Sequence, residues 1–266
     1  MKKIFALCAA SWQTMLSYRL QAVLGIVGLL ATVVPLFFIS GALQPLMANS
    51  IKAEGGQSFG FLLVGLATFS LVATAIGAVP SAVGSGIGSG VLEALMATPT
   101  RTPTLLAGLS IFPIAWAMLK AGIMLGAGWF LGANLIPSQV LPSTAILLMI
   151  IAAYIPVGLV AAAFVVAFRT AGPLPKGVIL VSGFLGGVYY PTHVIPSWLQ
   201  SISAFIPLTY GLRALRKVLL EGASLASVAP DLLALSFATL MLFAVGIVAL
   251  TAAFRYARRN GTLSQY

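Results

Sequence analysis

The chain has 266 residues; 60% of them are hydrophobic, only 7% are charged, and the formal net charge is +10 at pH 7. This composition excludes a soluble globular protein. It does not indicate nucleic-acid binding, because the lysines and arginines gather at the ends of apolar runs, where the positive-inside rule of membrane proteins places them. We therefore expect a polytopic membrane protein that contacts membrane lipids and no nucleic acid.

Long apolar runs divide the chain into membrane spans. Five stretches lack Asp, Glu, Lys and Arg, and each can hold a span of about 20 residues: 20–51, 55–92, 121–168, 177–212 and 232–254. We expect an all-α fold in one transmembrane domain over residues 1–266, with six spans at Ala22–Leu46, Phe59–Val79, Leu105–Leu131, Thr144–Phe168, Gly177–Tyr190 and Leu232–Phe254. Ahead of them, residues 1–20 predict an amphipathic helix in the cytoplasmic membrane interface.

The second span contains a proline near its end, and the third contains a lysine and closely spaced glycines. Pro80 is expected to close the second span, because proline disrupts a helix interior. In the third span, Lys120 is the one charge at membrane depth and costs about 2.5–3.5 kcal/mol on insertion scales; its amine either reaches the interface or faces a water-filled cavity. The spacing Gly122-x3-Gly126 in the same span predicts close helix packing.

The segment 81–103 is rich in Gly and Ser and then predicts a short helix, Val91–Ala97, which Pro99 ends. Its glycine run GSGIGSG is not a phosphate-binding loop, because no strand precedes it and no Gly-Lys-Ser/Thr follows it. Glu93 is the one acidic residue of the segment. From the residues alone, Glu93 is compatible both with a solvated surface charge and with a contact to a partner.

The segment 191–221 predicts two short helices, because Pro196 and Pro207 can begin a helix but cannot lie inside one. The apolar run before it, Gly177–Tyr190, is too short to cross a bilayer alone. We therefore expect an external re-entrant helical hairpin between this run and the last span, with Gly222 as its stop.

The second helix of this pair is amphipathic. Its leucines recur at helical spacing on one face, which predicts that this face is buried. The basic residues Arg213, Arg216 and Lys217 are expected on the other face, where they meet outer headgroups or substrate.

Two motifs make the chain resemble the ABC type-2 exporter permeases over essentially its whole length. They are P-L-T-Y-x-x-x-x-x-R, from Pro207 to Arg216, and G-V-L-E-A-L-M-A-T-P, from Gly90 to Pro99. The resemblance implies a coupling helix that docks into an ATPase subunit through Leu92, Glu93, Leu95, Met96, Thr98, Pro99 and Arg101. It also implies an external hairpin with functional positions at Tyr190, Pro191, Pro207, Thr209, Tyr210, Arg213, Arg216 and Lys217.

What the resemblance implies for function is a permease subunit of an ATP-driven exporter in the bacterial plasma (inner) membrane. Its substrate would be amphiphilic or lipid-like: a drug, a lipid or a lipid-linked glycan. The partners would be an ABC ATPase, which binds ATP and Mg, and a second permease copy in a homodimer. The chain itself would bind no cofactor and no metal.

The charges favour one orientation and leave one alternative function. Nine Lys and Arg flank the spans on the side of the two termini and four flank them on the other side, which favours cytoplasmic termini. A self-sufficient secondary carrier or channel is the alternative, although ion-coupled carriers usually keep an ionisable relay within the membrane and Lys120 alone qualifies. HExxH, Gly-x-Ser-x-Gly and Cys/His clusters are missing, so we expect no enzyme activity in this chain.

Overall fold

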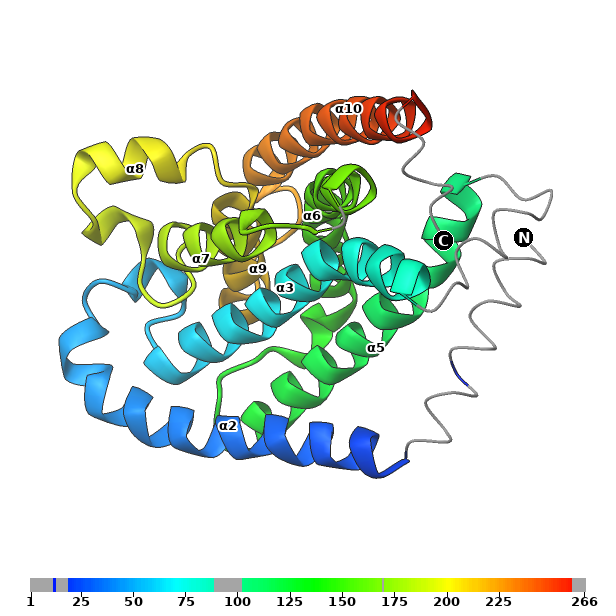
Figure 1. The fold of residues 1–266 in the computed structure, drawn as a ribbon. Helices are drawn as coiled ribbons and strands as arrows, with labels where there is room; N and C mark the ends of the chain where they lie inside the picture. The colour runs from blue at the N-terminus through cyan, green and yellow to red at the C-terminus, as the bar shows by residue number, and fades with distance from the viewer. Residues whose placement is uncertain (1–11, 13–18, 89–101, 169, 260–266) are drawn as a thin grey trace.

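The computed structural model describes residues 12, 19–88, 102–168 and 170–259, and this part of the chain is built from helices and the turns between them (Figure 1). The all-α prediction is confirmed for these residues. The elements in chain order are α2 (Arg19–Met47), η1 (Lys52–Glu54), α3 (Ser58–Gly88), α5 (Thr102–Phe130), η2 (Pro137–Gln139), α6 (Val140–Phe168), α7 (Leu174–Leu185), η3 (Thr192–Val194), α8 (Ser197–Ser203), α9 (Pro207–Glu221) and α10 (Ala229–Arg259).

Five helices, α2, α3, α5, α6 and α10, are long and apolar enough to cross a membrane, where the sequence led us to expect six. The fifth predicted span corresponds to α7, which has only 12 residues. At a rise of 1.5 Å per residue, α7 is about 18 Å long, while the hydrocarbon core of a bilayer is about 30 Å thick. Together, α7, α8 and α9 lead the chain from the end of α6 to the start of α10.

The expectation that Pro80 closes the second span is wrong, because α3 continues through it to Gly88. Leaving the helix at Pro80 would expose several backbone groups to an apolar surrounding, whereas continuing costs one backbone hydrogen bond. Side chains just before and after the proline also hold the helix in place. Val79 and Val83 pack with Val165 and Val166 of α6 in a second, smaller apolar cluster.

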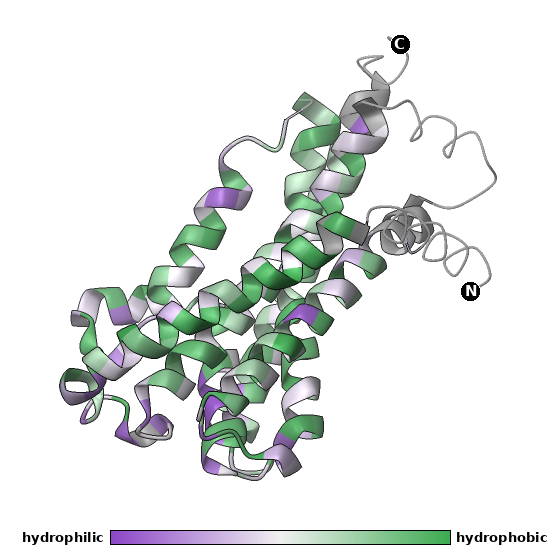
Figure 2. Cartoon of the chain, turned by 90° about the horizontal axis from the view of Figure 1, so that it is seen from below, coloured by the Kyte–Doolittle hydropathy of each residue, from purple (hydrophilic) through white to green (hydrophobic). Residues whose placement is uncertain are grey.

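The core of the bundle lies along α3 and α6. In their most apolar windows, 67% of α3 and 61% of α6 are buried, against 17% for α2, 22% for α5 and 11% for α10. Helix α3 packs against α2, α5 and α6, and α10 runs along α6. The outer helices therefore present wide apolar faces, as membrane-embedded helices do, and Figure 2 shows hydrophobic residues along their length.

Glycines allow two of these helices to approach closely. A Cβ on Gly158 of α6 would lie 2.9 Å from the carbonyl oxygen of Ile76 in α3, so the two backbones are in contact there. The expectation of close packing holds for Gly128 of α5, where a Cβ would collide with the side chain of Leu63 in α3, but it is wrong for Gly122 and Gly126. Nothing lies within 4 Å of a Cβ built on either residue, so no other part of the described chain packs on them.

The bundle has two distinct ends. The start of α2 and the end of α10 lie at one end, together with the end of α3 and the start of α5 (Figure 1). At the other end, α9 packs against η1, the first turns of α3 and the start of α10. The residues predicted to form the external hairpin therefore lie at the end opposite to the described ends of the chain.

Candidate functional site

Helix α9 has the boundaries that the sequence predicts. Pro207 occupies its first turn, where a missing N–H removes no hydrogen bond. It ends at Glu221, and Gly222 follows with a φ of 72°, a left-handed conformation that glycine adopts without a steric cost. Its apolar side chains are buried, as expected: Leu208, Leu212, Leu215, Val218 and Leu219.

Arg216 contradicts the expectation that it lies on the exposed face of this helix, because only 2% of it is exposed. The physical reason is its place on the helix surface. It lies four residues after Leu212 and three before Leu219, so it shares a face with both buried leucines. Lys217, one residue further, is half-buried, and Arg213 keeps 43% of its side chain exposed.

The guanidinium of Arg216 joins four segments of the chain. Its Nη1 donates to Oε2 of Glu54 at 3.0 Å and to the carbonyl oxygen of Gly187 at 2.8 Å. Its Nη2 donates to the carbonyl oxygens of Phe61 and Val188, both at 3.1 Å. We call Arg216 and these four partners the α9 anchor. It ties α9 to η1, to α3 and to the turn that follows α7.

Burial and ion pairing act in opposite directions on Arg216. Desolvation lowers the pKa of its guanidinium to about 10, and the nearby carboxylate of Glu54 limits that decrease. The group therefore stays protonated at neutral pH. Its Nε has no hydrogen-bond acceptor among the described residues, and the guanidinium carbon lies 3.4 Å from the centroid of the Phe61 ring, where a cation–π contact partly replaces one.

Gly65 makes room for the α9 anchor. A Cβ at this position would collide with the carbonyl oxygen of Val188 and lie 2.8 Å from Nη2 of Arg216. Gly77, three turns further along α3, has nothing within 4 Å of its own Cβ position. Both glycines are helical, so they differ mainly in what a methyl group would meet.

We expect Gly65→Ala to lower the free energy of unfolding by about 1–3 kcal/mol, because the added methyl group displaces a backbone carbonyl. Gly77→Ala is the control and should raise it by about 0.5–1 kcal/mol, since alanine restricts the unfolded chain. Equilibrium unfolding in detergent, followed by circular dichroism, measures both. A stabilising Gly65→Ala would show that the anchor tolerates the methyl group.

The P-L-T-Y motif fastens the start of α9 to α8. Oγ1 of Thr209 donates to the carbonyl oxygen of Ser203 at 2.9 Å, and Oγ of Ser203 donates to the carbonyl oxygen of Leu185 at 2.7 Å. The hydroxyl of Tyr210 donates to the carbonyl oxygen of Ala204 at 2.9 Å. Both polar residues of the motif therefore hold the turn between α8 and α9, and Thr209 is linked through Ser203 to the end of α7.

A second ion pair connects α9 to the last long helix. Nε of Arg213 donates to Oδ1 of Asp231 at 2.9 Å, and Nη2 donates to the same oxygen. The guanidinium also lies over the ring of Tyr210, 5.4 Å from its centroid. The hydrogen bond to Asp231 raises the pKa of Arg213, so this guanidinium stays protonated at neutral pH. Arg213 thus has a partner within the chain, Asp231, and its side chain lies on the same face of α9 as Tyr210.

The structure brings some of the predicted site residues together and leaves others apart. Tyr190 is half-buried and Pro191 is buried in the turn after α7, close to the α9 anchor in sequence. Lys120 lies in the middle of α5 and is half-buried. The predicted coupling residues, Leu92, Glu93, Leu95, Met96, Thr98, Pro99 and Arg101, lie outside the described residues, as does most of the predicted interfacial helix 1–20.

Sequence reasoning missed the partners of the arginines. Glu54 and Asp231 are two of only four acidic residues in the chain, and the predicted topology puts both on the side of Arg213 and Arg216. The presence of two acids on the same side as the two arginines indicates that ion pairs could form there. It does not show which arginine pairs with which acid. The roles of Phe61, Gly65 and the carbonyl oxygens depend on the packing of α3 against α9 and have no sequence signal.

The chemistry of this site is that of a joint between helices. Among the described residues, no group of three or more His, Cys, Asp and Glu could hold a metal ion. The charged groups of the α9 anchor are occupied by one another and by backbone carbonyls.

The chain matches a known protein family. The family model described as ABC-2 type transporter matches residues 5–220, which is most of the chain and includes the whole α9 anchor. No curated protein matches the chain.

Proposed function

The chain belongs to the ABC-2 type transporter family, and from this membership we propose that it is the membrane subunit of an exporter for an amphiphilic or lipid-like substrate. Members of this family are permease subunits of ABC transporters, in which a separate ABC ATPase subunit hydrolyses ATP. The protein is accordingly an integral membrane protein that obtains its energy from a partner. We propose export as the direction of transport and an amphiphilic or lipid-like compound as the substrate.

The observation that carries the proposal is the scarcity of charge in the candidate spans. Lys120 and Asp231 are the only Asp, Glu, Lys or Arg in the five span ranges, and Asp231, in the first turn of α10, is paired with Arg213. A relay for protons or other ions needs ionisable groups within the membrane. Because Asp231 lies in the first turn of its span and is paired, Lys120 is the one ionisable group deep within the described spans. Coupling to ATP and an apolar or amphiphilic substrate therefore fit these spans better than ion coupling and a charged solute.

The proposed orientation places both termini in the cytoplasm of a bacterial cell, with α9 at the outer side of the plasma membrane. Nine Lys and Arg on the terminal side against four on the other support it. Two of those four, Arg213 and Arg216, are paired with acids within the chain.

We further propose a homodimer with the substrate path between the two copies. The wide apolar faces of α2 and α10 leave room for a second copy as well as for lipid, and the core of a single bundle, along α3 and α6, is packed with its own side chains.

The test is a flux measurement in vesicles that contain the permease with the ATPase subunit that co-purifies with it. A fluorescent NBD-phospholipid is the probe, and dithionite bleaches it in the outer leaflet only. When ATP is added outside, only complexes with the cytoplasmic side outward are energised. Export then moves the probe into the inner leaflet, so we expect an ATP-dependent rise in protected fluorescence.

The control complex has an ATPase subunit whose phosphate-loop lysine is replaced, and it should show no ATP-dependent rise. An ATP-dependent loss of protected probe would contradict the proposed direction. Flux through the permease alone that follows an imposed ion gradient would support the secondary carrier instead.

A further inference from the structure

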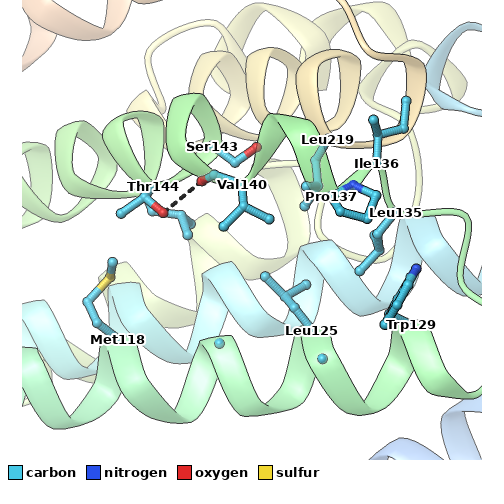
Figure 3. Close-up of a pocket in the computed structure, with 13 residues that line it drawn as sticks. Met118, Leu125, Trp129, Leu135, Ile136, Pro137, Val140, Ser143, Thr144 and Leu219 are labelled. Carbon is cyan, nitrogen blue, oxygen red and sulfur yellow. Dashed lines mark hydrogen bonds between the residues drawn. The ribbon is translucent and has the colours of Figure 1, made fainter.

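A cavity of about 280 Å³ lies between α5 and α6, next to the end of α9 (Figure 3). Its lining is almost wholly apolar and contains no charged side chain. From α5 it includes Gly122 and Gly126, the glycines on which no other part of the described chain packs. The cavity is therefore present because Gly122 and Gly126, one turn apart on α5, have no side chains to fill the space toward α6.

The position of the cavity fits one leaflet of a bilayer. On α5 it extends from Met118 to Trp129, so its length is about 16 Å at the rise of an α-helix, and half of a hydrocarbon core is about 15 Å. Trp129 and Val140, 49% and 57% exposed, border it at the surface of two candidate spans. A tryptophan at this end is typical of the membrane interface.

One polar group in the lining lacks a partner. Ser143 of α6 is only 3% exposed, and its Oγ has no hydrogen-bond partner among the described residues. The neighbouring hydroxyl of Thr144 is satisfied, because it donates to the carbonyl oxygen of Val140 at 2.8 Å (Figure 3). A buried hydroxyl without a partner is costly. The Oγ of Ser143 is itself buried, so the side chain has to rotate toward the cavity before the hydroxyl can donate to a molecule bound there.

We propose that this cavity binds one acyl chain of a membrane phospholipid, with the hydroxyl of Ser143 donating to an ester carbonyl oxygen of that lipid. The apolar walls match the acyl chain, and Ser143 lies within one turn of the start of α6, toward the headgroup level. The inference needs only a membrane-embedded protein and does not rest on the direction or the substrate of transport.

Two other occupants fit less well. An α-helix with its side chains is about 10–12 Å wide, so a helix of a second copy would lie across the mouth of the cavity and not enter it. Water needs two to four polar partners, and this lining offers one free hydroxyl. An extended acyl chain is narrow enough to follow the groove.

Native mass spectrometry of the purified full chain tests the proposal, with dioleoyl phosphatidylcholine as the probe lipid. Gly126→Leu should fill the cavity, so we expect the wild-type chain to retain one phospholipid more than this variant. Gly28→Leu on α2 is the matched control, because a Cβ on Gly28 also meets nothing within 4 Å. It should retain as many lipids as the wild type.

Equal lipid retention by the wild type and a folded Gly126→Leu variant would overturn the proposal. Loss of a permease dimer in that variant, with lipid retention unchanged, would assign the cavity to a second copy and overturn it as well.

A second arm does not depend on the folding of Gly126→Leu. The diether analogue of the same lipid has no ester carbonyl oxygen to accept from Ser143. The wild type should therefore prefer the diester lipid by about two- to tenfold, the range of one hydrogen bond. Ser143→Ala should abolish that preference. Equal retention of both lipids by the wild type would overturn the proposal.

Discussion

Arg216→Ala should lower the free energy of unfolding by about 3–5 kcal/mol, the largest effect we expect for any single substitution in the described chain. The substitution removes the donor that serves Glu54 and the carbonyl oxygens of Gly187, Val188 and Phe61. These groups lie in the contact between α9 and the rest of the bundle, where only 2% of the Arg216 side chain is exposed. The penalty is mostly the cost of acceptors left without a partner.

The control for this prediction is Arg213→Ala. Arg213 also forms an ion pair on α9, but 43% of its side chain is exposed, and its loss should cost about 0–1 kcal/mol. Arg216→Lys should fall between the two, because an amine keeps the charge but cannot reach all four acceptors in the geometry of the guanidinium. Equilibrium unfolding in detergent, followed by circular dichroism, compares the variants.

A double-mutant cycle with Glu54→Ala separates the ion pair from the backbone contacts. Removing both partners should cost less than the sum of the single losses, by about 0.5–3 kcal/mol, because neither charge is then left alone. If Arg216→Ala costs no more than Arg213→Ala, the α9 anchor contributes no more than an exposed ion pair and its assignment as a joint is wrong.

The second large effect is expected at Glu93, in the segment that resembles a coupling helix. The segment 89–101 lies outside the described residues, and it joins the end of α3 to the start of α5 at the end of the bundle opposite to α9. A contact that transmits ATPase closure needs a fixed polar group, and Glu93 is the one carboxylate of this segment. We propose that it pairs with a basic or amide group of the ATPase subunit.

If that contact is buried, Glu93→Ala should weaken the permease–ATPase interface by about 2–5 kcal/mol, or roughly 30- to 4,000-fold in affinity. Transport per ATP and substrate-stimulated ATP hydrolysis should both fall while the permease still folds and inserts. Glu221→Ala is the control, since Glu221 is an exposed acid at the other end of the bundle. ATPase rate and export are measured side by side in reconstituted vesicles. If neither changes in Glu93→Ala, Glu93 is an ordinary interfacial charge.

The sequence by itself determined the helices. Local rules were sufficient for α9: Pro207 begins it, the leucine spacing marks the buried face, and Gly222 ends it in a left-handed conformation. The length and apolarity of the long runs predicted six spans, and five of them correspond to helices able to cross a membrane, because a backbone in lipid must satisfy its hydrogen bonds within each segment. The motifs identified the family, since they are runs of adjacent residues and need no knowledge of packing.

Only the tertiary structure decided the surroundings of the residues that depart from these local patterns. Arg216 lies at the edge of the apolar face of α9, and its burial follows from four acceptors supplied by η1, α3 and the turn after α7. Pro80 stays inside α3 because α6 packs beside it. Gly122 and Gly126 border a cavity because the neighbouring helices approach α5 elsewhere. In each case the outcome depends on neighbours distant in the chain, so no local pattern could reveal it.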